Sequence, residues 1–239
     1  MPILTVLGLT DPGDADWTRL RGLQYSNLAR ASMARIVMQA VAGIVVASLF
    51  VGKVHLVALA GWLAALGASL FYGARIDRLL IDADRRRIAR DEVNAQTLSA
   101  IANALVWVVP LAVFAIFVGN PTRLELWTVL ATLMVASAIL LPAVPLSTLM
   151  FTGIVSGAAC VGFLFSDHFL TAAVCLAFAL TVCAGAILDA RRYLVTKLVE
   201  ASMSEKDEVV SLLLREFEEN EADWLWEIDT SRRVKAVSP

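Results

Sequence analysis

The chain has 239 residues, of which 59% are hydrophobic and 18% are charged, with a formal net charge of −2 and a mean hydropathy of +0.72. This composition is too apolar for a soluble domain of such length and indicates a membrane protein. The near-neutral charge predicts no nucleic-acid partner, because basic residues interleaved with acidic ones do not form a phosphate-binding surface.

Residues 1–32 are predicted to be a cytoplasmic lead-in. Trp17, Leu20, Leu23 and Leu28 recur at near-helical spacing. This pattern predicts a short helix at the membrane interface, with Trp17 at the depth of the lipid headgroups. The segment is polar near its start and lacks the pattern of a cleavable secretory signal.

Six apolar runs follow, each near the length of about 20 residues that a membrane-spanning helix needs. They are Ile36–Val51, Val54–Tyr72, Leu98–Val118, Leu126–Leu141, Val144–Phe165 and Phe169–Leu188. We therefore predict an all-α, polytopic membrane domain over residues 33–189. Its six transmembrane helices form three hairpins with short turns.

The basic residues predict the orientation of these spans, because Lys and Arg collect in cytoplasmic loops. If both termini are cytoplasmic (N-in, C-in), eighteen of the twenty Lys and Arg residues lie inside. Lys53 and Arg123 alone remain outside. The reverse orientation would place those eighteen residues outside, so we predict the N-in, C-in arrangement with membrane lipids as partners.

Small residues on the fifth run predict close helix packing. Gly153, Gly157 and Gly162 form a ridge of the kind that lets helix backbones approach in lipid. We expect this ridge to pack within the chain, with a dimer contact as the alternative. In the third run, Pro110 predicts a kink near the middle of the helix.

Polar groups within the spans are few, which bears on the class of function. Gln39, Asn103 and scattered hydroxyls are not the set expected of a transporter coupled to protons or sodium. A small-solute transporter or channel subunit stays open as the alternative function. Asp77, Asp82 and Asp84 alternate with arginines at helical spacing, which is typical of a solvated surface with salt bridges rather than of a catalytic site.

His55, Asp167 and His168 lie at the predicted outer ends of spans. Two imidazoles on one face can bind a metal or titrate near neutral pH. With so few ligands, we instead predict polar residues that cap helix ends, and no metal site. The three cysteines all fall within predicted spans and give neither a disulfide framework nor a metal-binding spacing.

Residues 190–219 are predicted to form a cytoplasmic linker helix. Its apolar positions fall on two a/d-type seams, formed by Leu194, Leu198 and Ala201, and by Val210, Leu213 and Phe217. Ser204-Glu205-Lys206-Asp207 separates the seams and predicts either a coiled-coil stutter or a new helix capped by Ser204. We expect this helix to form a homodimer and to relay a signal. The alternative is an amphipathic helix that lies on its own protein or on the bilayer.

Residues 220–239 change to a strand pattern. Trp224–Ile228 and Val234–Val237 flank the turn-like segment Asp229–Arg233, which predicts a β-hairpin. A lone hairpin is marginally stable in water. We therefore interpret these residues as the start of a soluble domain whose remainder is absent from this chain.

The tail resembles a known family. Glu216–Asp229, centred on Asp223-Trp224-Leu225-Trp226 and followed by Arg233-Val234 and Val237-Ser238-Pro239, resembles the opening of a PAS domain. The preceding Ser204–Leu214 is similar to linkers of bacterial integral-membrane signalling proteins. In that group a multi-span sensor precedes PAS and then a GGDEF/EAL cyclic-di-GMP enzyme or a histidine kinase.

The resemblance covers about forty tail residues. It implies an input module in the bacterial cytoplasmic (inner) membrane that relays a signal to a C-terminal PAS and output domain. These 239 residues contain no GGDEF, EAL or kinase motif. We therefore expect a non-catalytic chain without a cofactor.

Overall fold

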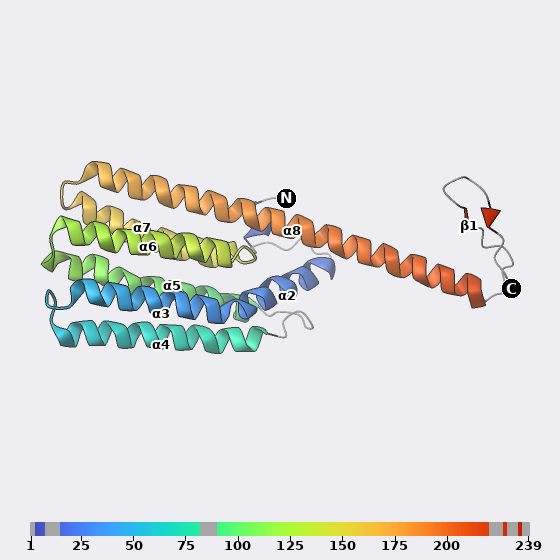
Figure 1. Ribbon diagram of the computed structural model, residues 1–239, viewed down its shortest axis with the longest axis horizontal. Helices are drawn as coiled ribbons and strands as arrows, with labels where there is room; N and C mark the ends of the chain where they lie inside the picture. The colour runs from blue at the N-terminus through green and yellow to red at the C-terminus, as the bar shows by residue number, and fades with distance from the viewer. Residues whose placement is uncertain (1–2, 8–14, 82–89, 220–226, 229–233, 236–239) are drawn as a thin grey trace. The chain divides into compact units, whose positions relative to one another are not determined.

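The computed structural model describes residues 3–7, 15–81, 90–219, 227–228 and 234–235. The chain divides into two compact units, Met1–Val195 and Thr196–Pro239. The helices are α1 Ile3–Val6, α2 Ala15–Arg30, α3 Ser32–Phe50, α4 Leu56–Leu80, α5 Arg90–Ala112, the 3₁₀ helix η2 Phe114–Phe117, α6 Asn120–Leu140, α7 Pro145–Leu164 and α8 Phe169–Glu219 (Figure 1).

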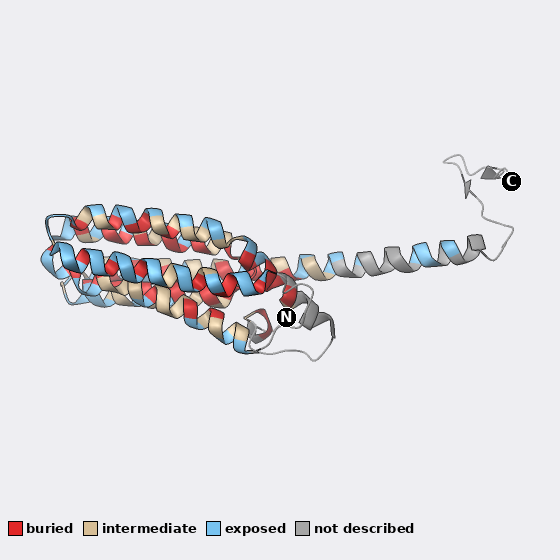
Figure 2. Cartoon of the chain, turned by 90° about the horizontal axis from the view of Figure 1, so that it is seen from below, coloured by how far each residue is buried: buried red, intermediate tan, exposed pale blue. Residues whose placement is uncertain are grey.

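Six helical segments of the described chain are long and apolar enough to cross a membrane, which confirms the predicted number of spans. They comprise α3, α4, α5 with η2, α6, α7 and the first part of α8. Their outward side chains are apolar too: Val57 is 77% exposed and Leu170 is 81% exposed (Figure 2). Helices that are hydrophobic all round fit lipid rather than water as their surroundings.

Aromatic side chains fill the half of the bundle near the α3–α4 turn. The Trp62 and Trp107 rings meet edge to face with centroids 5.6 Å apart, and Phe114 meets Trp62 at 6.1 Å. All three side chains are buried. Such pairs contribute about 0.5–1.5 kcal/mol beyond burial of their area, so this cluster fixes α4 against α5 and η2.

Helix α4 is longer than the predicted span, because it continues past Tyr72 to Leu80. Its buried positions Gly73, Ile76, Asp77 and Leu80 follow the three- and four-residue spacing of one helix face. The prediction that Asp77 lies on a solvated surface is therefore wrong: the residue is 1% exposed. Asp82 and Asp84, which were predicted to lie on the same solvated surface, are outside the described residues.

Pro110 lies in the last turn of α5 rather than near its middle, and the kink predicted there stays a prediction. Proline has no N–H, which leaves the carbonyl four residues earlier without its helical donor. That carbonyl belongs to Val106, and the indole Nε1 of Trp62 donates a hydrogen bond to it at 2.9 Å. The proline thus creates an acceptor that ties α5 to α4.

Helix α2 packs on the end of the bundle opposite the aromatic residues. The apolar side chains at this end, hereafter the α2 cluster, are Tyr25, Leu28, Ala29, Ile76, Leu80, Leu141, Ala143 and Val144. They come from α2, from α4 and from the turn between α6 and α7. The cluster holds α2 in place directly before α3 begins.

The second unit contains the last part of α8 and two short strands, β1 Glu227–Ile228 and β2 Val234–Lys235. The strands pair antiparallel, with Glu227 opposite Lys235 and Ile228 opposite Val234. These positions fall within the two predicted strands of the tail. A two-residue ladder does not distinguish one kind of domain from another.

The proline–indole link predicts a specific energetic coupling. Trp62→Phe leaves a buried carbonyl without a donor, which costs about 1–3 kcal/mol. Pro110→Ala restores a backbone N–H for that carbonyl, so Trp62→Phe should cost less in the Pro110→Ala background. A double-mutant cycle on the free energy of unfolding in micelles measures this difference. Equal costs in the two backgrounds would contradict the link.

Burial also predicts a pH effect at Tyr25. Burial raises the pKa of Tyr25 from 10.0 to about 12, and the nearby positive charge of Arg21 opposes the shift. The stabilisation from the neutral phenol is therefore complete below pH 10 and is lost as the pH rises through about 12. The difference between the ultraviolet titration curves of the wild type and of the Tyr25→Phe variant should show this phenolate appearing near pH 12. Its appearance near pH 10 would show that the ring is not buried.

Candidate functional site

Polar side chains from five helices converge inside the bundle next to the α2 cluster. This set, hereafter the polar cluster, consists of Ser32, Arg35, Gln39, Asp77, Gln96, Ser99, Asn103, Ser137, Ser147, Thr148 and Thr152. Each of the helices α3 to α7 contributes at least one member. Lipid cannot hydrogen-bond these groups, so their partners must come from the protein itself or from a molecule bound within it.

An ion pair links α3 to α4 within the cluster. The Arg35 guanidinium contacts Asp77 Oδ2 through Nη2, and Ser32 Oγ donates to the same oxygen at 2.5 Å. The Asp77 side chain is 2% exposed and that of Arg35 is 14% exposed. A single charge at the centre of a membrane helix costs about 2.5–3.5 kcal/mol on insertion scales. Pairing is therefore the condition under which both charges can be buried here.

Gly73 provides the space for this arrangement one turn before Asp77. A Cβ atom at Gly73 would lie 3.2 Å from Ser99 Oγ and 3.9 Å from Arg35 Nη2. The first distance is tighter than usual for a Cβ atom, whereas the second is an ordinary contact. The missing side chain therefore lets Ser99 of α5 approach the backbone of α4.

A cavity of about 50 Å³ lies among the polar residues, lined by Arg35, Gln39, Gln96, Ala100, Asn103, Ser137, Leu141, Ser147, Thr148 and Phe151. Gln96 Oε1, Ser147 Oγ and Thr148 Oγ1 are buried and have no hydrogen-bond partner among the described residues. One water needs about 10–15 Å³ of such space and two to four polar partners. The cavity can thus hold water or a very small polar solute.

Two amides of the cluster have defined partners. Trp107 Nε1 donates to Gln39 Oε1 at 3.2 Å, and Ser69 Oγ donates to Asn103 Oδ1 at the same distance. The first bond connects the polar cluster to the aromatic residues. The second bond links α4 to α5.

This convergence was not predicted from the sequence, because its key members flank the predicted spans. Arg35 precedes the first run, Asp77 follows the second, and Gln96 precedes the third. The helices extend past those limits. A usable signal was present: Gln96, Ser99 and Asn103 share one helix face at three- and four-residue spacing.

The predicted outer-face residues lie at the opposite end of the bundle and do not form a metal site. His168 Nε2 lies 2.6 Å from Asn120 Nδ2. His55 precedes α4 without the predicted capping hydrogen bond from its side chain, and Asp167 adopts φ 59° in the turn before α8. In the part of the chain that the structure describes, no three His, Cys, Asp or Glu residues form a potential metal-binding group.

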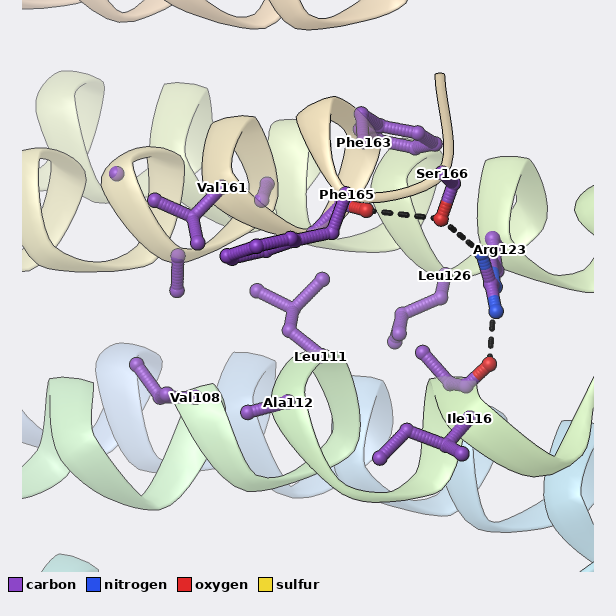
Figure 3. Close-up of a pocket in the computed structure, with 15 residues that line it drawn as sticks. Val108, Leu111, Ala112, Ile116, Arg123, Leu126, Val161, Phe163, Phe165 and Ser166 are labelled. Atoms are coloured by element: carbon purple, nitrogen blue, oxygen red, sulfur yellow. Dashed lines mark hydrogen bonds between the residues drawn. The ribbon is translucent and has the colours of Figure 1, made fainter. Parts of the chain in front are cut away.

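A larger apolar groove of about 650 Å³ lies at this same end, between α5, η2, α6 and α7 (Figure 3). Gly157 and Gly162 line it, whereas Gly153 does not. A Cβ atom at Gly153 or Gly157 would meet no atom within 4 Å. The predicted packing of these two glycines against another helix of the chain is therefore absent from the described structure.

The predicted relay residues fall into three groups. Leu194 is 1% exposed and packs against Val6 and Ala190 of the same chain, so it is not available to a second copy. Leu198 is half-buried and Val210 is exposed. The side chains of Ala201, Leu213 and Phe217 lie outside the described residues.

Comparisons of this chain with protein-family models, with characterised proteins and with solved structures find no match. A function for the chain therefore has to be inferred from the geometry described above and from the resemblance of the tail.

The buried ion pair predicts strong non-additivity. Arg35→Leu leaves Asp77 as an uncompensated buried charge and should lower the free energy of unfolding by about 3–5 kcal/mol. Adding Asp77→Leu removes that charge and should recover most of the loss. Arg75→Leu, which changes an exposed arginine on α4, is the matched control and should be nearly neutral. If the double variant instead loses the sum of the two single effects, the residues do not act as a pair.

Proposed function

We propose that the chain is a membrane-embedded input module that relays a signal through α8 to a C-terminal PAS and output domain. The single observation that carries this proposal is the burial of Ala190 and Leu194, the residues of α8 that follow its apolar span. They pack against Val6 of α1. This contact fixes α8 to α1 directly after the predicted span.

A chain of contacts supports a route from the polar cluster to α8. Ser32 and Arg35 bind Asp77 from the first turn of α3, and α2 ends at Arg30 directly before it. On α2, Asn27 Nδ2 donates a hydrogen bond to the hydroxyl of Tyr193 on α8. Tyr193 also packs against the α2 cluster. A shift of α3 would thus reach α8 through α2.

The polar cluster supplies a physical basis for two states. The side-chain oxygens of Gln96, Ser147 and Thr148 have no partner within the described chain in this arrangement and could gain hydrogen bonds after a small helix shift. A stimulus changes such an equilibrium only by binding one arrangement better than the other. In this proposal the stimulus acts within the bilayer or at its edge, and the chain itself is non-catalytic.

The location, the orientation and the oligomeric state of the module are also proposals. The bacterial inner membrane is what the resemblance of the tail implies, and both termini are proposed to be cytoplasmic because this orientation satisfies the distribution of basic residues. A homodimer would form through α8 after Val195, where Val210 is an exposed apolar side chain.

Insertions in α8 test the relay. The full chain is joined after Pro239 to an enzyme domain whose activity depends on the phase of the preceding helix. Each residue inserted after Ser204 rotates the following helix by roughly 100°. Insertions of one, two or three residues should therefore change the output activity. A seven-residue insertion is close to two full turns and should restore it.

The insertion series has its own control in membrane integration, which should be equal in all variants because the spans are unchanged. Output that is indifferent to the one-, two- and three-residue insertions would rule out helical transmission. Loss of output with the seven-residue insertion as well would mean that output depends on the length of the helix rather than on its phase.

Passage of a small neutral solute is a second candidate, and the polar cavity favours it. Polar side chains inside a span commonly mark a substrate path. Purified protein in liposomes would then accelerate solute-driven swelling, and Thr148→Val, which removes an unpaired hydroxyl at nearly constant volume, would alter the rate. Swelling at the rate of empty liposomes would exclude this function.

A further inference from the structure

The apolar groove near the α7–α8 turn has the shape and chemistry of a site for a lipid chain. Its walls come from the last turns of α5, from η2 and from the second half of α7, and α6 also contributes. Leu111 and Phe165 point into the space between α5 and α7 (Figure 3). Its volume of about 650 Å³ lies within the roughly 300–1,000 Å³ of ordinary ligand sites.

Small residues keep this groove open. A Cβ atom at Gly157 would meet no atom within 4 Å, and one at Gly162 would first meet the Leu111 carbonyl oxygen at 4.0 Å. Both glycines are exposed on the side of α7 that lines the groove. In a bilayer, an open apolar groove on a lipid-facing surface is filled by the apolar component of its surroundings.

A cation lies at the polar end of the groove. Arg123 Nε donates to the Ala115 carbonyl at 2.9 Å, and Nη1 donates to Ser166 Oγ at 2.5 Å. These bonds fix the guanidinium but leave other N–H groups as donors. Among the described residues, neither Glu125 nor Asp167 forms a salt bridge with Arg123.

The position of Arg123 matches the depth of a lipid headgroup. It lies in the first turn of α6, and its partner Ser166 lies in the turn that follows α7. If these helices span the bilayer, both residues are at one membrane surface, while the groove extends along the last turns of α5 and α7. An anionic headgroup and one apolar chain are complementary to this combination.

We propose that the groove binds one acyl chain of an anionic phospholipid from the surrounding bilayer, with the phosphate of that lipid at Arg123. A helix from a second copy is the competing occupant. The fixed guanidinium of Arg123 at the polar end favours an anionic headgroup over the apolar face of a helix. The proposal goes beyond the proposed function and does not depend on it.

Retention of lipid by the purified full chain tests the site. Native mass spectrometry compares phosphatidylglycerol with phosphatidylcholine of the same acyl chains. The wild type should retain phosphatidylglycerol in preference. Gly157→Leu fills the groove and should abolish retention, whereas Gly153→Leu, one turn away on α7 and outside the groove, should not.

The headgroup contact has a separate pair of variants. Arg123→Gln should lower phosphatidylglycerol retention about fivefold, the usual effect of one basic residue at a lipid surface, and should remove the preference over phosphatidylcholine. Lys53→Gln is the matched control, because Lys53 is a cation at the same end that donates to Thr122 instead. It should leave the preference unchanged.

Photo-crosslinking of the wild type makes the test independent of variant folding. A phosphatidylglycerol with a photoreactive acyl chain should label peptides that contain Leu111 or Phe165. Labelling confined to other surfaces, or equal retention by the wild type, Gly157→Leu and Arg123→Gln, would overturn the proposal. A change from dimer to monomer in Gly157→Leu without loss of lipid would assign the groove to a second copy and overturn it as well.

Discussion

A polar group inside a bilayer must find its hydrogen-bond partner within the protein, and the Arg35–Asp77 pair is where this constraint is strictest. The pair fixes α3 to α4, and Ser32 donates to the same carboxylate oxygen, whereas Asp77 Oδ1 has no partner among the described residues. Gly73 is part of this arrangement, because a Cβ atom there would lie 3.2 Å from Ser99 Oγ. The other members of the polar cluster are arranged around this contact.

The two ends of the bundle differ in the polarity and hydrogen bonding of their buried side chains. Near α2, polar side chains meet around a small cavity, and several hydroxyl and amide oxygens stay unpaired within the described residues. Near the α3–α4 turn, aromatic rings and the bond from Trp62 to the Val106 carbonyl hold α4 against α5, and the apolar groove lies at the same end. The two ends of the bundle therefore differ in polarity: unpaired polar atoms of the described chain collect near α2, and aromatic and apolar side chains collect near the α3–α4 turn.

The six spans could be predicted from the sequence because a run of about 20 apolar residues is long enough to cross the hydrocarbon core as a helix. The ends of the spans could not. Charged residues marked the limits of the predicted runs, so Asp77 was placed in solvent, although it continues the buried face of α4. The hydrogen bond that the carbonyl four residues before Pro110 accepts could not be predicted either, because its donor comes from another helix, which no local pattern reveals.

The candidate site was still harder to predict. Its members come from five helices, and one sequence does not show which faces meet. The ridge of Gly153, Gly157 and Gly162 suggested close helix packing, yet Gly157 and Gly162 line an open groove. Leu194 fitted a dimer seam by spacing, yet Val6 covers it. Both differences arise because small and apolar residues occur on surfaces that face lipid, another helix or a cavity. The sequence does not distinguish these surroundings.

The central claim is that the bundle crosses the bilayer with the α2 end and the start of the tail on the same side. Labelling of single cysteines with an impermeant maleimide tests it most directly, after replacement of the three native cysteines by alanine. We predict that Gly52→Cys and Asp167→Cys react in intact cells, whereas Arg75→Cys and Arg192→Cys react only after permeabilisation. Reaction of Arg75→Cys and Arg192→Cys on opposite sides of the membrane would contradict the claim.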